Sequence, residues 1–307
     1  MSPTVPLVGI FGPTALGKTE IALALAERLD GEIVAADSMQ VYSGLPILTN
    51  QPRTGEVGGI AHHLVAFVDP QREFSVAEYA RLARETLSEI AGRGRTAVIE
   101  GGSGLYVRAA FGTLDFGVPP NRALRVELEQ RIAADPAAVY ADLARADPEA
   151  AARVDRANPR RVVRALEIAL TRGDCARPAG DRLWAAGARD AGGRLFALEP
   201  DRDELRARID ARIDRMLADG LVAEVEALLR SGTPSRTVVQ AIGVRECAAL
   251  LAGEIDLDEA VASMRSRTRR LVRRQLTWMR KLPDAVRIAT AGRSPGDVVQ
   301  EIIRRLR

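Results

Sequence analysis

A phosphate-binding loop is the feature that most constrains this chain. Residues 12–19 read GPTALGKT, which matches the pattern G-x-x-x-x-G-K-[ST]. An apolar run at 5–11 precedes the loop, and residues 20–29 have the apolar spacing of an amphipathic helix. This strand–loop–helix order is the context that the pattern requires, because backbone N–H groups then surround an anion at the positive end of a helix. We therefore predict that a phosphate or diphosphate binds to Gly12, Pro13, Thr14, Ala15, Leu16, Gly17, Lys18 and Thr19.

Lysine usage supports this prediction. The chain has 44 Lys and Arg residues, but lysine occurs only at Lys18 and Lys281. A lysine retained inside the loop indicates a need for a compact ammonium group, which a planar guanidinium does not replace. The Thr19 hydroxyl beside it can reach a magnesium ion, so Mg²⁺ is the expected cofactor and Thr19 its protein ligand.

The composition excludes several classes of protein. A chain of 307 residues with 47% hydrophobic and 28% charged residues is typical of a soluble globular protein. The two cysteines, Cys175 and Cys247, are too few for a disulfide framework or a four-cysteine zinc site. No apolar run approaches transmembrane length, and no signal-peptide pattern opens the chain. We expect a cytoplasmic monomer with no membrane partner. The net charge is only +3, so a nucleic acid would need a local basic patch.

Short apolar runs between helical patterns predict an α/β fold with a P-loop-type parallel sheet. Further strands are expected at 32–36, 64–68, 96–99 and 194–198. The carboxyl ends of parallel strands face the ligand crevice of such a sheet. Asp37 directly follows the run 32–36, so we expect its carboxylate beside the phosphate loop, at the place of chemistry. The alternative is that Asp37 caps a helix.

The only histidines are adjacent, at His62 and His63. Neighbouring residues at the start of a strand point to opposite faces, so they do not form a two-histidine metal site. We expect both to have structural roles.

Two domains are expected. Residues 1–116 and 185–307 would form the α/β core, and residues 117–184 a helical insertion. Residues 121–172 have helical periodicity throughout, with helix starts at Asp147-Pro148 and Asn158-Pro159. Arg160 and Arg164 lie one turn apart in this region.

Residues 264–281 are strongly basic. They include seven arginines, one lysine and no acidic residue. Packing of Leu271, Gln275, Leu276 and Met279 would leave an exposed basic ridge, and so many like charges repel each other when nothing compensates them. Arg, Gln, Thr and Trp interleaved on this ridge favour phosphate contacts and base stacking. The alternative is a basic surface helix that binds no nucleic acid.

A second arginine pair, Arg208 and Arg212, lies one turn apart in a helix expected from Asp201 to about 217. Asp210 and Asp214 could pair with these arginines. By themselves the residues favour a solvated charged face.

Several motifs together resemble one family, the tRNA dimethylallyltransferases. The resemblance covers nearly the whole chain, and the elements DS-x-Q-VY and Q-x-T-W-x-R are the most specific. The motifs, in family order, are GPTALGKT at 12–19, DSMQVYSGL at 37–45, HHL at 62–64, FS at 74–75, GGSGLY at 101–106, RRVVRALE at 160–167, IGVRE at 242–246 and RRQLTWMR at 273–280.

This resemblance implies transfer of a dimethylallyl group from dimethylallyl diphosphate to the exocyclic amine of the adenosine immediately 3′ of the anticodon in tRNA. It places the diphosphate in the phosphate loop and makes Asp37 the base. Lys18, Thr19 with Mg²⁺, and Arg212 would neutralise the leaving diphosphate. The tRNA anticodon stem-loop would contact Asp37, Ser38, Met39, Gln40, Ser103, Arg125, Arg160, Arg161, Arg164, Gln240, Gly243, Arg245, Arg273, Arg274, Gln275, Thr277, Trp278 and Arg280.

The chain departs from the family pattern at a few positions. Gln51 stands where a lysine is usual, Ser103 replaces a threonine, Val244 an aromatic residue and Glu100 an apolar one. Two alternatives remain at this stage. One is a small-molecule kinase that uses ATP and shares the Lys18/Thr19 loop, and the other is a non-catalytic RNA-binding ATPase. The first gives no reason for the basic ridge, and the second leaves Asp37 without a role.

Overall fold

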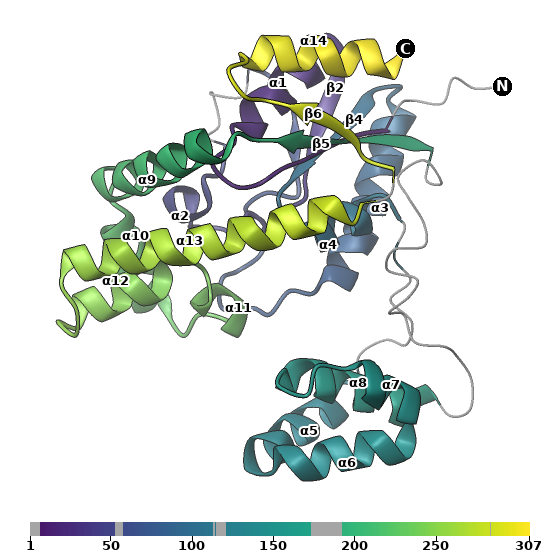
Figure 1. The fold of residues 1–307 in the computed structure, drawn as a ribbon, viewed down its shortest axis with the longest axis vertical. Helices are drawn as coiled ribbons and strands as arrows, with labels where there is room; N and C mark the ends of the chain where they lie inside the picture. The colour runs from purple at the N-terminus through teal and green to yellow at the C-terminus, as the bar shows by residue number, and fades with distance from the viewer. Residues whose placement is uncertain (1–6, 53–57, 113, 115–120, 173–191, 283) are drawn as a thin grey trace. The chain divides into compact units, whose positions relative to one another are not determined.

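The computed structural model describes residues 7–52, 58–112, 114, 121–172, 192–282 and 284–307 (Figure 1). The chain divides into two compact units, one of residues 1–114 and 186–307 and one of residues 115–185. Among the described residues, none of the helices combines the length and the apolar character that a membrane span needs.

Six strands of the described chain form one parallel sheet. In chain order they are β1 (Leu7–Phe11), β2 (Gly31–Ala35), β3 (His62–His63), β4 (Thr96–Gly101), β5 (Gly193–Glu199) and β6 (Val286–Ala289). Their order across the sheet is β3-β2-β4-β1-β5-β6, and every pairing is parallel. The predicted α/β fold is confirmed. Since β1 lies between β4 and β5, the loop that follows it opens at the carboxyl edge next to the ends of these two strands, and β2 lies one strand further along, beyond β4.

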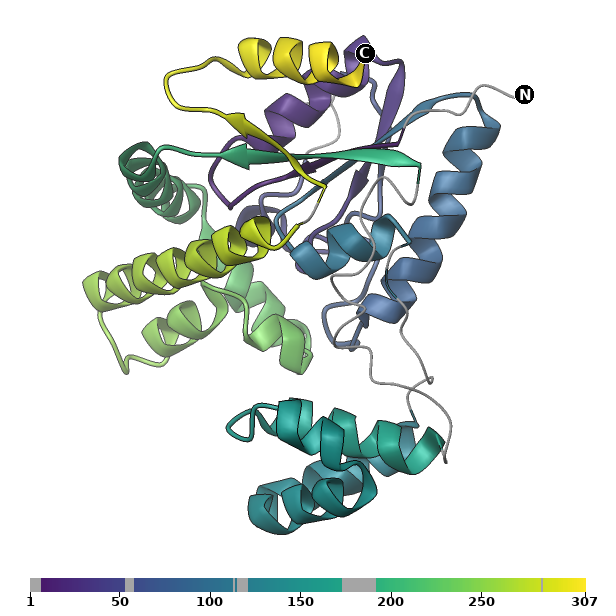
Figure 2. The ribbon, with the colours of Figure 1, turned by 45° about the vertical axis from the view of Figure 1, so that its right-hand side comes forward.

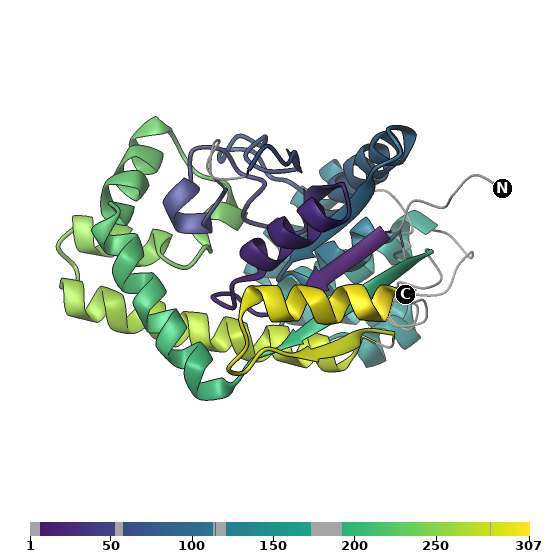
Figure 3. The ribbon, with the colours of Figure 1, turned by 90° about the horizontal axis from the view of Figure 1, so that it is seen from above.

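Helices cover both faces of this sheet (Figures 2 and 3). α1 (Lys18–Arg28) and α14 (Pro295–Leu306) pack on one face, and α3 (Val76–Gly92) and α4 (Gly104–Ala110) on the other. The core under α1 and α14 includes Ile10, Leu25, Phe196 and Ile302, all fully buried. A capping box formed by Ser75 and Glu78 starts α3.

The remaining helices of this unit lie toward the carboxyl edge of the sheet (Figure 1). They are α2 (Pro46–Thr49), α9 (Arg202–Ala218), α10 (Leu221–Ser231), α11 (Arg236–Val239), α12 (Val244–Leu251) and α13 (Leu257–Arg280). α13 packs against α9, α12 and α4, so it connects the outer helices to α4, which packs on the sheet.

The second unit is helical in its described part. It contains α5 (Arg122–Ala134), α6 (Pro136–Ala146), α7 (Pro148–Arg153) and α8 (Pro159–Arg172). Its own core includes Leu128, Leu143, Val162 and Leu166. Asp147 accepts the N–H of Ala150 and caps α7, and α8 begins at Pro159, so both predicted helix starts are confirmed.

One predicted strand is absent, and one strand of the structure was not predicted. Residues 64–68 do not form a strand, because Leu64 and Ala66 have φ angles of +61° and +54°, which belong to the left-handed region. Only Val68 forms a bridge, with Tyr42. β6, a four-residue edge strand that contains Arg287 and follows a long helix, was not predicted. A segment of only four residues is too short to show a clear periodic signal.

Candidate active site

The phosphate loop has the predicted strand–loop–helix context. It follows β1 directly, and α1 begins at Lys18, inside the motif. Ala15 and Gly17 have φ angles of +66° and +85°, so the backbone turns sharply before the helix. The Lys18 ammonium donates to the carbonyl of Pro13 at 3.0 Å and so lies back across the loop. The loop geometry is that of an anion site at a helix N-terminus.

Charged residues from four separate segments line one cavity of about 150 Å³ beside this loop. Burial lowers the pKa of Lys18, while the nearby carboxylates of Glu100 and Asp37 raise it. Burial also lowers the pKa of the Arg212 guanidinium, and the nearby Asp37 carboxylate partly offsets this decrease. The cavity lining includes Thr14, Lys18, Thr19, Asp37, Met39, Gln40, Glu100, Arg212 and Gln275.

Asp37 lies where the strand argument predicts, two residues beyond β2 and in the cavity lining. One carboxylate oxygen accepts the N–H of Met39 at 2.8 Å, which fixes the orientation of the side chain. No described helix begins at this point, since the next one, α2, begins at Pro46. The alternative that Asp37 caps a helix is therefore wrong.

Arg212 extends from α9 to the phosphate loop, where it donates to the Thr14 hydroxyl at 3.2 Å. Arg208, one turn earlier, donates to the carbonyl of Leu16 at 3.3 Å. The expected pairing with Asp210 and Asp214 is wrong, because these carboxylates bind arginines of α13 instead.

Arg208 was missed as a site residue. Its spacing of four residues from Arg212 places it on the same face of α9, and this was the available signal.

Glu100, a departure from the family pattern, is a further site residue that was not predicted. It is the fifth residue of β4 and only 7% exposed. The Thr19 hydroxyl donates to its carboxylate at 3.0 Å. Burial raises the pKa of Glu100, and the Lys18 ammonium opposes this effect. Like Asp37, Glu100 is a carboxylate near the carboxyl end of a strand beside the loop, so the same rule about strand ends predicts its place in the site.

Gln275 links α13 to the phosphate loop. The backbone N–H of Thr14 donates to its side-chain oxygen at 3.0 Å, and its amide nitrogen donates to the carbonyl of Gly102 at 3.0 Å. The prediction that Gln275 packs inward is confirmed, and its expected place on an exposed ridge is wrong. Trp278 is half-buried, and its ring lies over Gly104. The ring is so close that a Cβ atom on residue 104 would clash with it. Both side chains join α13 to the glycine-rich turn after β4.

The segment after Asp37 is held by amides and hydroxyls. The Ser38 and Ser103 hydroxyls lie 3.3 Å apart, which connects the segment to α4. The Gln40 amide donates to the carbonyls of Thr49 and Asn50 at 3.3 and 3.1 Å. Gln51, which stands in place of the usual lysine, donates to the carbonyls of Gln40 and Tyr42.

The basic segment of α13 falls into two halves. In the first, Arg265 pairs with Asp214, Arg267 with Glu246 and Arg269 with Asp210. The expectation that nothing compensates these charges is wrong for this half.

In the second half, Arg270, Arg273 and Arg274 are exposed, and no carboxylate of the described chain lies within salt-bridge distance of them. Arg280 donates to the Thr277 hydroxyl at 3.1 Å. This half keeps the exposed positive charge that was predicted.

The loop before α12 and the first turn of α12 contain three more predicted tRNA residues. The carbonyl of Gln240 accepts a hydrogen bond from Arg267 at 2.8 Å, and Arg245 is exposed. Gly243 has a φ angle of +111°, and a Cβ atom there would lie 2.8 Å from Leu48. Any larger residue would therefore strain this loop.

Two of the four arginines predicted in the helical unit bind one buried carboxylate. Glu167 is 1% exposed and binds Arg125 at 2.6 Å and Arg164 at 2.9 Å. Arg160 and Arg161 are exposed at the start of α8. A contact of these arginines with tRNA stays a prediction.

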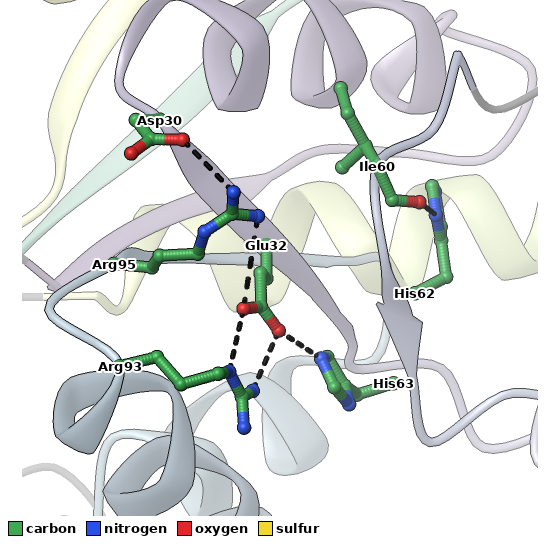
Figure 4. Close-up of polar contacts among 7 residues, drawn as sticks. All are labelled: Asp30, Glu32, Ile60, His62, His63, Arg93 and Arg95. Carbon is green, nitrogen blue, oxygen red and sulfur yellow. Dashed lines mark hydrogen bonds and ion pairs between the residues drawn. The ribbon is translucent and has the colours of Figure 1, made fainter.

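The histidines have structural roles, as expected (Figure 4). His63 lies 2.6 Å from a carboxylate oxygen of Glu32, which also binds Arg93 at 2.7 Å. The Nδ1 atom of His62 lies 3.0 Å from the carbonyl oxygen of Ile60. No group of three His, Cys, Asp or Glu side chains in the described residues could hold a metal ion.

Comparison with known proteins gives consistent matches. A family model described as IPP transferase matches residues 40–282. A tRNA dimethylallyltransferase of Nocardioides sp. is 44% identical over 288 residues, which cover 92% of each chain. One of Thermomicrobium roseum is 40% identical over 288 residues, 92% of this chain and 85% of the relative. The crystal structure of the tRNA isopentenylpyrophosphate transferase of Bacillus halodurans is 36% identical, with a TM-score of 0.72 over 98% of this chain and 95% of that one.

Proposed function

This chain belongs to the IPP transferase family of tRNA dimethylallyltransferases, and we propose how its cavity residues carry out the reaction. The enzyme transfers a dimethylallyl group from dimethylallyl diphosphate to the N6 amine of the adenosine immediately 3′ of the anticodon in tRNA. The observation that carries the assignment of residues is the convergence of Lys18, Thr19, Asp37 and Arg212 on one cavity. The family membership favours this transferase over the small-molecule kinase that shares the loop.

The phosphate loop and its cations hold the leaving group. When the bond between the allylic carbon and the diphosphate oxygen breaks, the electron pair stays on the diphosphate. Lys18 and Arg212, supported by the loop N–H groups, stabilise the charge that develops there. Arg212 already donates to the Thr14 hydroxyl within the loop, so its position needs little reorganisation.

Asp37 acts as the base. An exocyclic amine is a weak nucleophile, and a carboxylate that accepts its proton during attack makes the transfer feasible. The new bond joins N6 to the allylic carbon, and the displaced proton goes to Asp37. The hydrogen bond from Met39 orients the carboxylate before substrate arrives. The adenine must leave the anticodon-loop stack to enter the cavity, at a cost of a few kcal/mol that pocket contacts offset.

The residues around Thr19 fit a magnesium ion. Mg²⁺ prefers oxygen ligands and is usually held by one or two protein groups together with substrate phosphates. The Thr19 hydroxyl, at the first turn of α1 beside the loop, is such a ligand. When bound, the ion would add positive charge next to the diphosphate.

Two basic surfaces are proposed to bind the anticodon stem-loop. One is the second half of α13, with Arg270, Arg273 and Arg274 exposed. The other is the helical unit, with Arg160 and Arg161 at the start of α8. Arginines of this kind contact phosphates and position the RNA.

A transfer assay tests the function. Purified protein with Mg²⁺, radiolabelled dimethylallyl diphosphate and unmodified tRNA should give label in the tRNA, without ATP turnover in a parallel assay. Absence of label, together with ATP turnover that does not need tRNA, would contradict the proposal and favour the kinase.

A further inference from the structure

Glu100 is a second carboxylate in the active site, and the reaction described above gives it no role. It lines the same cavity as Asp37 and is almost completely buried at the end of β4. Burial of a carboxylate costs free energy unless the group is paired or hydrogen-bonded, and a carboxylate beside a site for an anionic substrate also repels that substrate. The contacts of Glu100 indicate a role in the site.

The Thr19 hydroxyl donates its one proton to Glu100, at 3.0 Å. A hydroxyl has a single donor and two lone pairs, so this bond leaves the oxygen lone pairs available to a cation. Partners that hold a metal ligand in this way fix its orientation and tune its affinity for the metal. Glu100 is thus placed to orient the Thr19 hydroxyl.

The charge of Glu100 also balances the site. Lys18 and Arg212 contribute two positive charges to the cavity, and Asp37 and Glu100 contribute two negative ones. When all four side chains are ionised, they contribute no net charge to the site, whereas the other three would contribute +1 without Glu100. An ionised Glu100 repels a diphosphate that arrives alone and attracts the Mg²⁺ that arrives with one.

We propose that Glu100 makes diphosphate binding depend on Mg²⁺, by orienting the Thr19 hydroxyl toward the metal and by opposing diphosphate that carries no metal. This inference rests on the proposed binding of diphosphate and Mg²⁺ at the loop. It assigns Glu100 as a positioning residue that acts through Thr19.

Binding of inorganic diphosphate, measured by calorimetry with Mg²⁺ or with a chelator, tests this assignment. In the wild-type protein Mg²⁺ should strengthen binding strongly. In Glu100→Gln, binding without Mg²⁺ should become about 3- to 10-fold tighter, and the strengthening by Mg²⁺ should shrink by about tenfold. The matched control is Glu20→Gln, which removes the same charge from an exposed position next to Thr19 and should leave both values unchanged.

A second variant separates charge from hydrogen bonding. Glu100→Val removes both, and valine suits a buried strand position, so the fold should be kept. It should reduce the effect of Mg²⁺ further than Glu100→Gln, because glutamine still offers an oxygen to Thr19.

Different results would contradict the role of Glu100 and the proposed binding of diphosphate at the loop. If Mg²⁺ strengthens diphosphate binding equally in wild type, Glu100→Gln and Glu100→Val, Glu100 has a purely structural role and the inference is overturned. If the wild-type protein binds no diphosphate under either condition, the proposed function of the loop itself is overturned.

Discussion

Strand β2 has a carboxylate near each end, and the two carboxylates have different surroundings. Near the amino end, Glu32 binds Arg93 and His63 and is 3% exposed (Figure 4). Beyond the carboxyl end, Asp37 accepts the N–H of Met39 and forms no ion pair with any described residue.

The comparison shows that ion pairing, rather than residue type, distinguishes the structural carboxylate of this strand from the one proposed to be catalytic. The contacts of Glu32 join β2 to β3 and to the end of α3, and they leave its oxygens little capacity for another partner. Asp37 lies with Lys18 and Arg212 in the cavity and can still accept a proton from a substrate. A carboxylate without an ion pair beside an anion site is therefore the better candidate for catalysis.

The largest effect is expected from Asp37→Ala, which removes the proposed base. The transfer rate should fall by about 10²- to 10⁴-fold, the range for loss of a general base, while tRNA affinity stays nearly constant. Single-turnover transfer and filter binding measure the two quantities. Asp69→Ala is a matched control, because Asp69 accepts the N–H of Gln71 at 2.8 Å in the same kind of turn but does not line the cavity. Unchanged transfer by Asp37→Ala would contradict the proposed base.

Glu32→Gln should have the opposite pattern. It breaks a buried ion pair, so the free energy of unfolding should fall by about 2 kcal/mol, while the transfer rate stays within about threefold. Urea denaturation measures the first value. Glu85→Gln removes an exposed pair with Arg81 and should change stability by less than about 0.5 kcal/mol. A Glu32→Gln protein with native stability and slow transfer would reverse the comparison between the two ends of β2.

The pH dependence of stability sharpens this prediction. The hydrogen bond from Arg93, with that of His63, lowers the pKa of Glu32 from 4.5 to about 2. A lowered pKa in the folded state means that the pair stabilises the protein above about pH 4.5 and that this contribution is lost as pH falls toward 2. The difference in unfolding free energy between wild type and Glu32→Gln should therefore shrink over that interval.

The smallest effect is expected from arginine substitutions in α13. Here too, the side chains without an ion pair are the candidates for function, and the paired ones are structural. Replacing both Arg273 and Arg274 by alanine should weaken tRNA binding by about tenfold and lower the slope of log affinity against log salt by about two. Arg269→Ala, which breaks the pair with Asp210, should leave that slope unchanged. Equal slopes for wild type and the double variant would show that the unpaired arginines do not contact phosphates.

Much of the site could be predicted because its parts have local signals. The phosphate loop is a contiguous motif, and Asp37 follows from one rule about strand ends in a parallel sheet. Arg212 was predicted only through the family resemblance. The alternating charges of its helix are typical of a solvated face, and nothing in the sequence nearby indicates that Arg212 contacts the phosphate loop. Gln275 shows the same limit, because its two bonds, to Thr14 and to Gly102, span 261 and 173 residues of sequence.

By itself, the sequence determined the parallel α/β fold, the anion loop and the carboxylate beside it, because strand period, glycine spacing and helix caps act over a few residues. Only the tertiary structure decided which charges remain unpaired. Arg208 and Arg212 lie against the loop because the aspartates between and after them pair with α13. Glu100 became part of the site because β4 lies beside β1 and brings its carboxylate to Thr19. Compensation of charge depends on neighbours that are distant in sequence, and no local pattern contains that information.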